Sequence, residues 1–168
     1  MARRWVTNPG CALAFSLILH PRSGEVDKLP FFAPLAGLAV SKALERLGLE
    51  AEIKWPNDVL VERKKVCGIL VEASWSGDHP QGMVIGIGVN VAPCSMPPAS
   101  ELLFPAGCVE QALGRPVDRV ELLAHILAHL FDLRPTLASA EFMQDWEQRL
   151  AFRGEMVQVE PPGQPALV

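Results

Sequence analysis

The sequence has no excess of positive charge and no long apolar run. Fifteen Lys and Arg face nineteen Asp and Glu, giving a net charge of -4 and a pI near 5.6. Nonspecific nucleic-acid affinity needs many unopposed cations, so we expect neither DNA nor RNA as a partner. No run approaches the roughly 18 apolar residues of a membrane helix, and the apolar segment ending at His20 has no small-residue cleavage site. We therefore expect a cytoplasmic protein without a membrane partner.

The sequence also lacks a CxxC pair. Its four cysteines fall at unrelated spacings, at Cys11, Cys67, Cys94 and Cys108. Two of them lie inside apolar runs, and scattered cysteines in a protein of a reducing compartment are usually thiols. We predict core thiols rather than a metal site or a disulfide framework.

The remaining composition is that of one soluble globular domain. The chain has 168 residues, of which 49% are hydrophobic and 20% charged. Apolar periodicity and turn signals predict strands at 11–20, 51–55, 66–73, 83–91 and 156–159, and helices at 30–48, 107–113, 117–133 and 140–150. Residues 74–82 and 92–106 are predicted loops, with Trp75 expected to pack. This order indicates an α+β fold, a mixed or antiparallel sheet covered by helices.

Two histidines on one predicted helix are a weak metal signal. His125 and His129 are four residues apart and share a face, but no third ligand lies nearby in sequence. We expect them to be surface or packing residues.

The sequence KWPNDVLVERKKVCGILVE at 54–72 places many polar groups beside a buried strand. A proline-directed turn explains Asn57 and Asp58 but not Lys54. If 54–61 and 65–73 pair as a hairpin, Lys65 lies near Asp58. A lysine and a carboxylate brought together in this way form either a structural ion pair or a site for a charged ligand.

Glycines interrupt both neighbouring predicted strands, at Gly68, Gly86 and Gly88. Glycine inside a strand often marks the close approach of a ligand or of backbone. The GIG sequence is not a dinucleotide fingerprint, because it lacks a third glycine and a following helix. No arrangement of serine, cysteine and histidine suggests covalent catalysis. The pattern predicts a ligand groove lined by lysine, aspartate, two asparagines and bare backbone.

Three blocks carry a family resemblance: KWPND at 54–58, RKKVCGILVE at 63–72 and VIGIGVNV at 84–91. Their order and spacing resemble the catalytic domain of biotin protein ligases. Weaker agreement covers WVTNPGCALAFSL and the predicted helix at 31–47. The resemblance implies synthesis of biotinyl-5′-adenylate from biotin and MgATP, followed by transfer of biotin to a lysine of a carboxylase carrier domain.

The resemblance also implies residue roles. Lys65 and Asp58 would be catalytic, with Lys65 holding the biotin carboxylate and Asp58 also a candidate Mg²⁺ ligand. The implied biotin-binding residues are Lys65, Gly68, Leu70 and Gly86, and the implied nucleotide-binding residues are Lys54, Asn57, Asn90, Trp5 and Arg3. Biotin, ATP and Mg²⁺ would be substrates, with no tightly bound metal. A homodimer is also open, because the family often pairs through sheet edges.

The chain departs from the family pattern at both ends. Arg3, Arg4 and Trp5 match only the end of the family's GRGRxGR loop, and the preceding Thr/Ser-rich strand has no counterpart. We expect residues 1–152 to be a shortened ligase-like catalytic domain and 153–168 the truncated start of a small β-domain. Two alternatives stay open: an impaired domain that binds only nucleotide or a partner, and a relative of lipoate ligase or octanoyl transferase.

Overall fold

The computed structural model describes residues 5, 7–98, 102 and 104–158. In this part of the chain five antiparallel strands form one sheet in the order β1-β5-β4-β3-β2. Their bounds are β1 Ala12–Leu19, β2 Ala51–Lys54, β3 Asp58–Val61, β4 Lys64–Ser76 and β5 His79–Asn90. The predicted α+β fold is therefore confirmed, with an antiparallel sheet.

The helices follow the predicted order. Their bounds are α1 Phe32–Arg46, α2 Val109–Leu113, α3 Arg119–Leu133 and α4 Ala140–Gln148, with 3-10 turns η1 Val26–Phe31, η2 Pro93–Ser95 and η4 Arg134–Thr136. Asp118 caps α3, since its carboxylate accepts hydrogen bonds from the backbone N–H groups of Val120 and Glu121. Gly48, at φ +98°, follows α1 in the left-handed conformation that suits a helix C-terminus.

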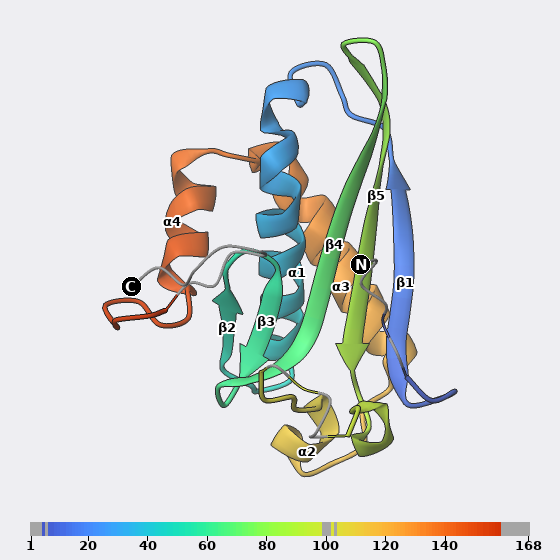
Figure 1. Ribbon diagram of the computed structural model, residues 1–168, viewed down its shortest axis with the longest axis vertical. Helices are drawn as coiled ribbons and strands as arrows, with labels where there is room; N and C mark the ends of the chain where they lie inside the picture. Colours follow the sequence, from blue (N-terminus) through green and yellow to red (C-terminus); the bar gives the residue numbers. More distant parts are fainter. Residues whose placement is uncertain (1–4, 6, 99–101, 103, 159–168) are drawn as a thin grey trace.

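Helices α1 and α3 pack on one face of the sheet, with α4 beside α1 (Figure 1). The strands alternate accordingly: in β5 the buried residues Met83, Ile85, Ile87 and Val89 point toward the helices. Their alternate neighbours lie on the opposite face, which we call the open face. This face carries the candidate site.

The β4–β5 hairpin is longer than predicted. Both strands run through most of the predicted loop, to Ser76 and from His79, because cross-strand pairing overrides the turn-forming residues there. Trp75 lies near the tip and is 54% exposed, so the prediction that it packs is wrong.

Two other predictions are corrected. Residues 156–158 are not in a strand, and Val159 lies outside the described residues. Cys11 and Cys94 form a disulfide, because the pairing of β1 with β5 brings two positions 83 residues apart side by side. Cys67 and Cys108 are free and buried, as predicted.

Candidate functional site

The open face arranges the predicted site residues in two rows across the sheet. One row of cross-strand partners consists of Lys54, Asp58, Gly68, Gly88 and Ala14. A second, parallel row consists of Leu70, Gly86 and Ser16. Direct partners in an antiparallel sheet share a face, so residues from three separate sequence blocks lie side by side.

Two ammonium groups flank one carboxylate in the first row. The Lys65 Nζ is 2.5 Å from Asp58 Oδ1, and the Lys54 Nζ is 3.6 Å from Asp58 Oδ2. The Asp58 side chain is only 13% exposed, whereas each lysine is about one-third exposed. The trio has a surplus positive charge that faces outward, which suits an anionic ligand.

The backbone around Lys65 is held from both sides. A register shift between Val59 and Leu60 makes Leu60 the β3 partner of Lys65. On its other side, where β5 has ended, the Lys65 N–H donates to the Pro105 carbonyl (2.8 Å) and the Gly107 N–H donates to the Lys65 carbonyl (2.9 Å). Lys65 is thus anchored at the sheet end while its ammonium reaches Asp58. The predicted proximity of Lys65 and Asp58 is confirmed.

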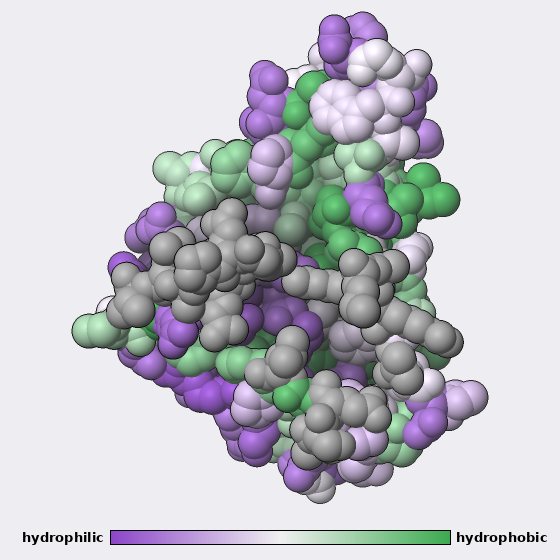
Figure 2. Space-filling model, in the orientation of Figure 1, coloured by the Kyte–Doolittle hydropathy of each residue, from purple (hydrophilic) through white to green (hydrophobic). Residues whose placement is uncertain are grey.

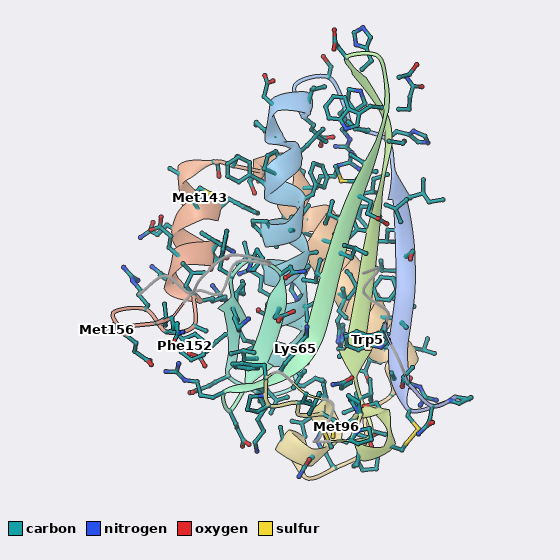
Figure 3. All side chains as sticks on the ribbon, viewed as in Figure 1. Trp5, Lys65, Met96, Met143, Phe152 and Met156 are labelled. Carbon is teal, nitrogen blue, oxygen red and sulfur yellow. A yellow bond between two sulfur atoms is a disulfide. The ribbon has the colours of Figure 1, made fainter. Side chains whose placement is uncertain are left out.

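Trp5 lies on the two glycines of the first row, which we call the glycine floor (Gly68 and Gly88). A methyl group built on Gly88 would come within 2.5 Å of indole carbons, and one on Gly68 within 3.0 Å of the indole and 3.2 Å of Lys65 Nζ. The indole and the ammonium therefore stand side by side over the same strand, as Figure 3 shows for the labelled residues Trp5 and Lys65. The sequence predicts Gly68 as a biotin-binding residue and Gly88 as a close approach of ligand or backbone, and it groups Trp5 with the nucleotide-binding residues.

The side chains of the two predicted asparagines, Asn57 and Asn90, donate hydrogen bonds to backbone carbonyl groups. The Asn57 Nδ2 donates to the Ile69 carbonyl (2.6 Å), and the Ile69 N–H donates to the Asn57 carbonyl (2.9 Å). Asn90 is 5% exposed, and its Nδ2 donates to the Gly107 carbonyl (3.0 Å). Their amide nitrogens position β4 and the segment beside Lys65, and their predicted contact with nucleotide stays a prediction.

Phe104 was missed by sequence reasoning. The Lys54 Nζ lies 5.2 Å from the centre of its ring, and the ring meets Phe152 edge to face at 6.4 Å. Phe104 stands in a proline-rich loop without periodicity, so no sequence signal marked it. Arg3 lies outside the described residues.

The fit of Asp58 to a resident metal is poor. Both carboxylate oxygens face ammonium groups, and the described residues contain no group of three His, Cys, Asp or Glu that could hold a metal ion. Mg²⁺ commonly keeps its waters and binds through substrate phosphates instead of through a complete protein cage.

The open face changes character along the strands. Ile18, Leu70 and Val84 are exposed apolar side chains on β1, β4 and β5. Figure 2 shows a green, apolar patch below the pale and purple tip of the β4–β5 hairpin, and purple, hydrophilic atoms among those visible further down. An apolar group and a charged group of one ligand would thus find different surroundings on this face.

A model of the Biotin/lipoate A/B protein ligase family matches residues 2–90, which include both rows of the site. The chain belongs to this family. It is 37% identical to a Biotin--[acetyl-CoA-carboxylase] ligase of Paracoccus denitrificans over 92% of this chain and 67% of that protein. It is 38% identical to the Bifunctional ligase/repressor BirA of Bacillus subtilis, over 76% of this chain and 39% of BirA.

Solved structures agree with the fold. The biotin protein ligase from Aquifex aeolicus in complex with biotin and ATP superposes with a TM-score of 0.80 at 31% identity, covering 98% of this chain and 68% of that one. The chain spans about two-fifths of the length of the Bacillus relatives and two-thirds of the Paracoccus and Aquifex ligases. The family membership expected from the three sequence blocks is confirmed. No helix in the described part of the chain is both long and apolar enough to cross a membrane.

Proposed function

We propose that this chain is the catalytic part of a biotin protein ligase. It would join biotin to ATP as biotinyl-5′-adenylate, release pyrophosphate, and transfer biotin to a lysine of a carboxylase carrier domain. One observation carries the proposal: an ammonium group, Lys65, stands next to a glycine floor and an indole on an otherwise open sheet face. This pairs a carboxylate-binding group with a flat apolar surface, and biotin carries its carboxylate on an apolar aliphatic chain next to an apolar sulfur-containing ring. The names of the relatives and of the biotin- and ATP-bound Aquifex structure support the assignment.

Lys65 acts on the reacting carboxylate. Its ammonium pairs with the biotin carboxylate and orients one oxygen toward the α-phosphorus of ATP. As the oxygen–phosphorus bond forms and pyrophosphate leaves, negative charge at the reacting centre stays within reach of the same ammonium. In the second step the amine of the acceptor lysine attacks the acyl carbon, and AMP leaves with the phosphate oxygen.

Asp58 positions Lys65. Its carboxylate is largely buried and contacts both lysines, so it holds the two ammonium groups at fixed places before substrate arrives. Preorganised charge costs no reorganisation during the reaction. We assign to Asp58 this role, together with orientation of the incoming amine, in preference to direct coordination of Mg²⁺.

Trp5 belongs to the biotin side of the site. Its indole rests on the glycine floor beside Lys65, which places it next to the carboxylate-binding group. Leu70 and Gly86 continue the same face in the second row. The biotin ring system would lie along Trp5, Leu70 and Gly86, where apolar contact and bare backbone leave room for it.

Lys54 and Phe104 mark the nucleotide side. The Lys54 ammonium lies between Asp58 and the Phe104 ring, on the flank of the site away from Trp5. A phosphate of MgATP would pair with Lys54. The carrier domain would approach the open face, and we place the protein in the cytoplasm, where ATP is supplied.

The test measures the reversible formation of biotinyl-5′-adenylate. Biotin, MgATP and labelled pyrophosphate are incubated with the chain, and the biotin-dependent appearance of label in ATP is measured. We expect Lys65→Ala to lower exchange by roughly 10²- to 10³-fold. Lys64→Ala is the matched control, because Lys64 is the adjacent lysine and pairs with Glu62 outside the site.

Two outcomes would contradict the proposal. Exchange that is equal in Lys65→Ala and the control would remove Lys65 from the reaction. Exchange that depends on lipoate or octanoate and not on biotin would assign the chain to the lipoate branch of the family.

A further inference from the structure

The Cys11–Cys94 disulfide connects two segments that both border the candidate site. Cys11 directly precedes β1, and the short segment before it carries Trp5 on the glycine floor. Cys94 lies in η2, and the chain beyond it returns at 105–107 to pair with Lys65. Figure 3 shows this bond as a yellow link at the lower end of β1.

Two hydrogen bonds accompany the disulfide among the described residues. The Asn8 Nδ2 donates to the Cys94 carbonyl (2.9 Å), and the Ala92 N–H donates to the Cys11 carbonyl (2.8 Å). Both join the same short stretches of chain as the sulfur atoms. Neither bond involves a sulfur atom, so neither is broken directly when the disulfide is reduced.

The two sulfur atoms differ in access. Cys94 is exposed, whereas Cys11 is 7% exposed. Thiol–disulfide exchange begins with attack on an accessible sulfur, which points to Cys94.

The other two cysteines do not compete. Cys67 and Cys108 are free and buried, and burial raises the pKa of both thiols above the ordinary value. The reactive form is the thiolate, so these thiols stay inert while the protein is folded.

We propose that Cys11 and Cys94 form a reversible thiol–disulfide site that controls how firmly the Trp5 segment is held against the glycine floor. The co-reactant is a small thiol with its disulfide, such as glutathione. A thiolate attacks the Cys94 sulfur and expels the Cys11 thiolate, which takes a proton. A second thiolate attacks the small-molecule sulfur of the mixed disulfide and expels Cys94. The cysteine pair gains two electrons and two protons, and two small thiols become one disulfide.

The proposed compartment and the position of the bond both favour a reversible disulfide. Disulfides of cytoplasmic proteins are usually transient or redox-sensing, because thiol systems keep cysteines reduced there. The Cys94 sulfur of this bond belongs to an exposed residue. The bond also restrains the segment that carries Trp5, which would contact the bound ligand. The expectation of a reducing environment and the ligand consequence rest on the proposed function, but the accessibility of Cys94 and the motion of Trp5 do not.

The first experiment measures the redox equilibrium. The full chain is equilibrated in buffers with different ratios of reduced to oxidised glutathione, quenched with acid, alkylated and analysed by mass spectrometry. We expect Cys11 and Cys94 to become oxidised and reduced together across the glutathione range. A bond that stays intact in fully reduced glutathione, or never forms in oxidised glutathione, would overturn the proposal.

The second experiment measures Trp5. Quenching of its fluorescence by acrylamide is obtained by subtracting the signal of Trp5→Phe, in both redox states. We expect reduction, or Cys94→Ser, to raise the accessibility of Trp5 to quencher, by at most about threefold because Trp5 is already 36% exposed, since a covalent restraint on the segment is lost. Cys94 is chosen because it is exposed and its replacement leaves the core intact. Cys108→Ala serves as a control that retains the response to reduction.

Equal quenching in the oxidised and reduced chains would overturn the link between the disulfide and Trp5. Neither experiment uses biotin or ATP. Failure of the ligase assignment and failure of this inference are therefore seen separately.

Discussion

Trp5 lies directly on Gly88: a methyl group added at Gly88 would stand 2.5 Å from two carbons of the indole, a distance that real side chains do not adopt. The absence of a side chain at this strand position is therefore explained by an aromatic residue of the same chain. Gly88 therefore determines how closely the Trp5 indole can approach the sheet at the candidate site.

Gly88→Ala should displace the indole. Overpacking of this kind typically costs about 1–3 kcal/mol, and the indole would move because Trp5 is 36% exposed and not enclosed by the core. We expect altered Trp5 fluorescence, measured against Trp5→Phe, and weaker binding of a non-hydrolysable biotinyl-AMP analogue by calorimetry. Gly82→Ala on the same strand is the matched control, because its methyl group would meet nothing closer than 3.7 Å. Unchanged fluorescence and affinity in Gly88→Ala would refute the role of Trp5.

Asp58→Asn should lower activity more than stability, because Asp58 is proposed to position the two lysines. The variant keeps the shape of the side chain but removes the charge that holds Lys65 and Lys54. We expect pyrophosphate exchange to fall by about tenfold or more, with a smaller change in thermal stability, because the lysines remain partly solvated. Restoration of exchange by Asp58→Glu would agree with a positioning carboxylate. Full activity of Asp58→Asn would exclude the role.

Asn90→Ala should loosen the segment that pairs with Lys65. The buried amide donates to the Gly107 carbonyl, and its removal leaves that buried oxygen without this partner, at a cost of about 1–3 kcal/mol. We expect faster amide hydrogen exchange at Lys65 and Gly107, whose N–H groups form the adjoining hydrogen bonds. Asn8→Ala, which removes the hydrogen bond from the segment before β1 to the Cys94 carbonyl, should leave these two amides unchanged. Protection of Lys65 and Gly107 that matches the unmodified chain would count against this assignment.

The buried pair of Glu25 and Arg134 should make stability depend on pH. Arg134 Nε and Nη2 donate to the two Glu25 carboxylate oxygens at 2.9 and 2.7 Å. The hydrogen bond from Arg134 is the main cause that lowers the pKa of Glu25 below its ordinary value of 4.5, and burial partly opposes it. A carboxyl group with a lowered pKa in the folded state stabilises the fold above its unfolded pKa, and this contribution disappears as pH falls through the folded value.

We therefore expect the free energy of unfolding, measured by urea at several pH values, to decrease below about pH 4.5. Arg134→Met should cost about 3–5 kcal/mol at neutral pH, because it leaves the Glu25 charge buried without its partner. In Glu25→Gln the decrease at low pH should be smaller, whereas the exposed Asp27→Asn should retain it. An identical pH profile in Glu25→Gln and the unmodified chain would contradict the assignment.

Local sequence signals were sufficient for most secondary structure. Apolar spacing placed α1, β1, β2, β4 and β5, and Asp118 marked the start of α3, since these features depend on residues a few positions apart; β3 at Asp58–Val61 was expected only as part of a possible hairpin. The Lys65–Asp58 contact was also predictable, because a short hairpin brings its two ends together. Chain ends and strand-extending loops were less predictable, as the unformed strand at 156–158 and the long β4–β5 hairpin show.

The sequence by itself determined the family, the α+β order of elements and the ion pair at the hairpin, because each depends on adjacent residues or on ordered motifs. Only the tertiary structure decided that Trp5 covers Gly88, that Phe104 stands over Lys54 and that Cys11 bonds to Cys94. These relationships join segments far apart in the chain. Their distances follow from how β1, β4 and β5 align and how the loop after β5 returns to Lys65, which no local pattern of residues encodes.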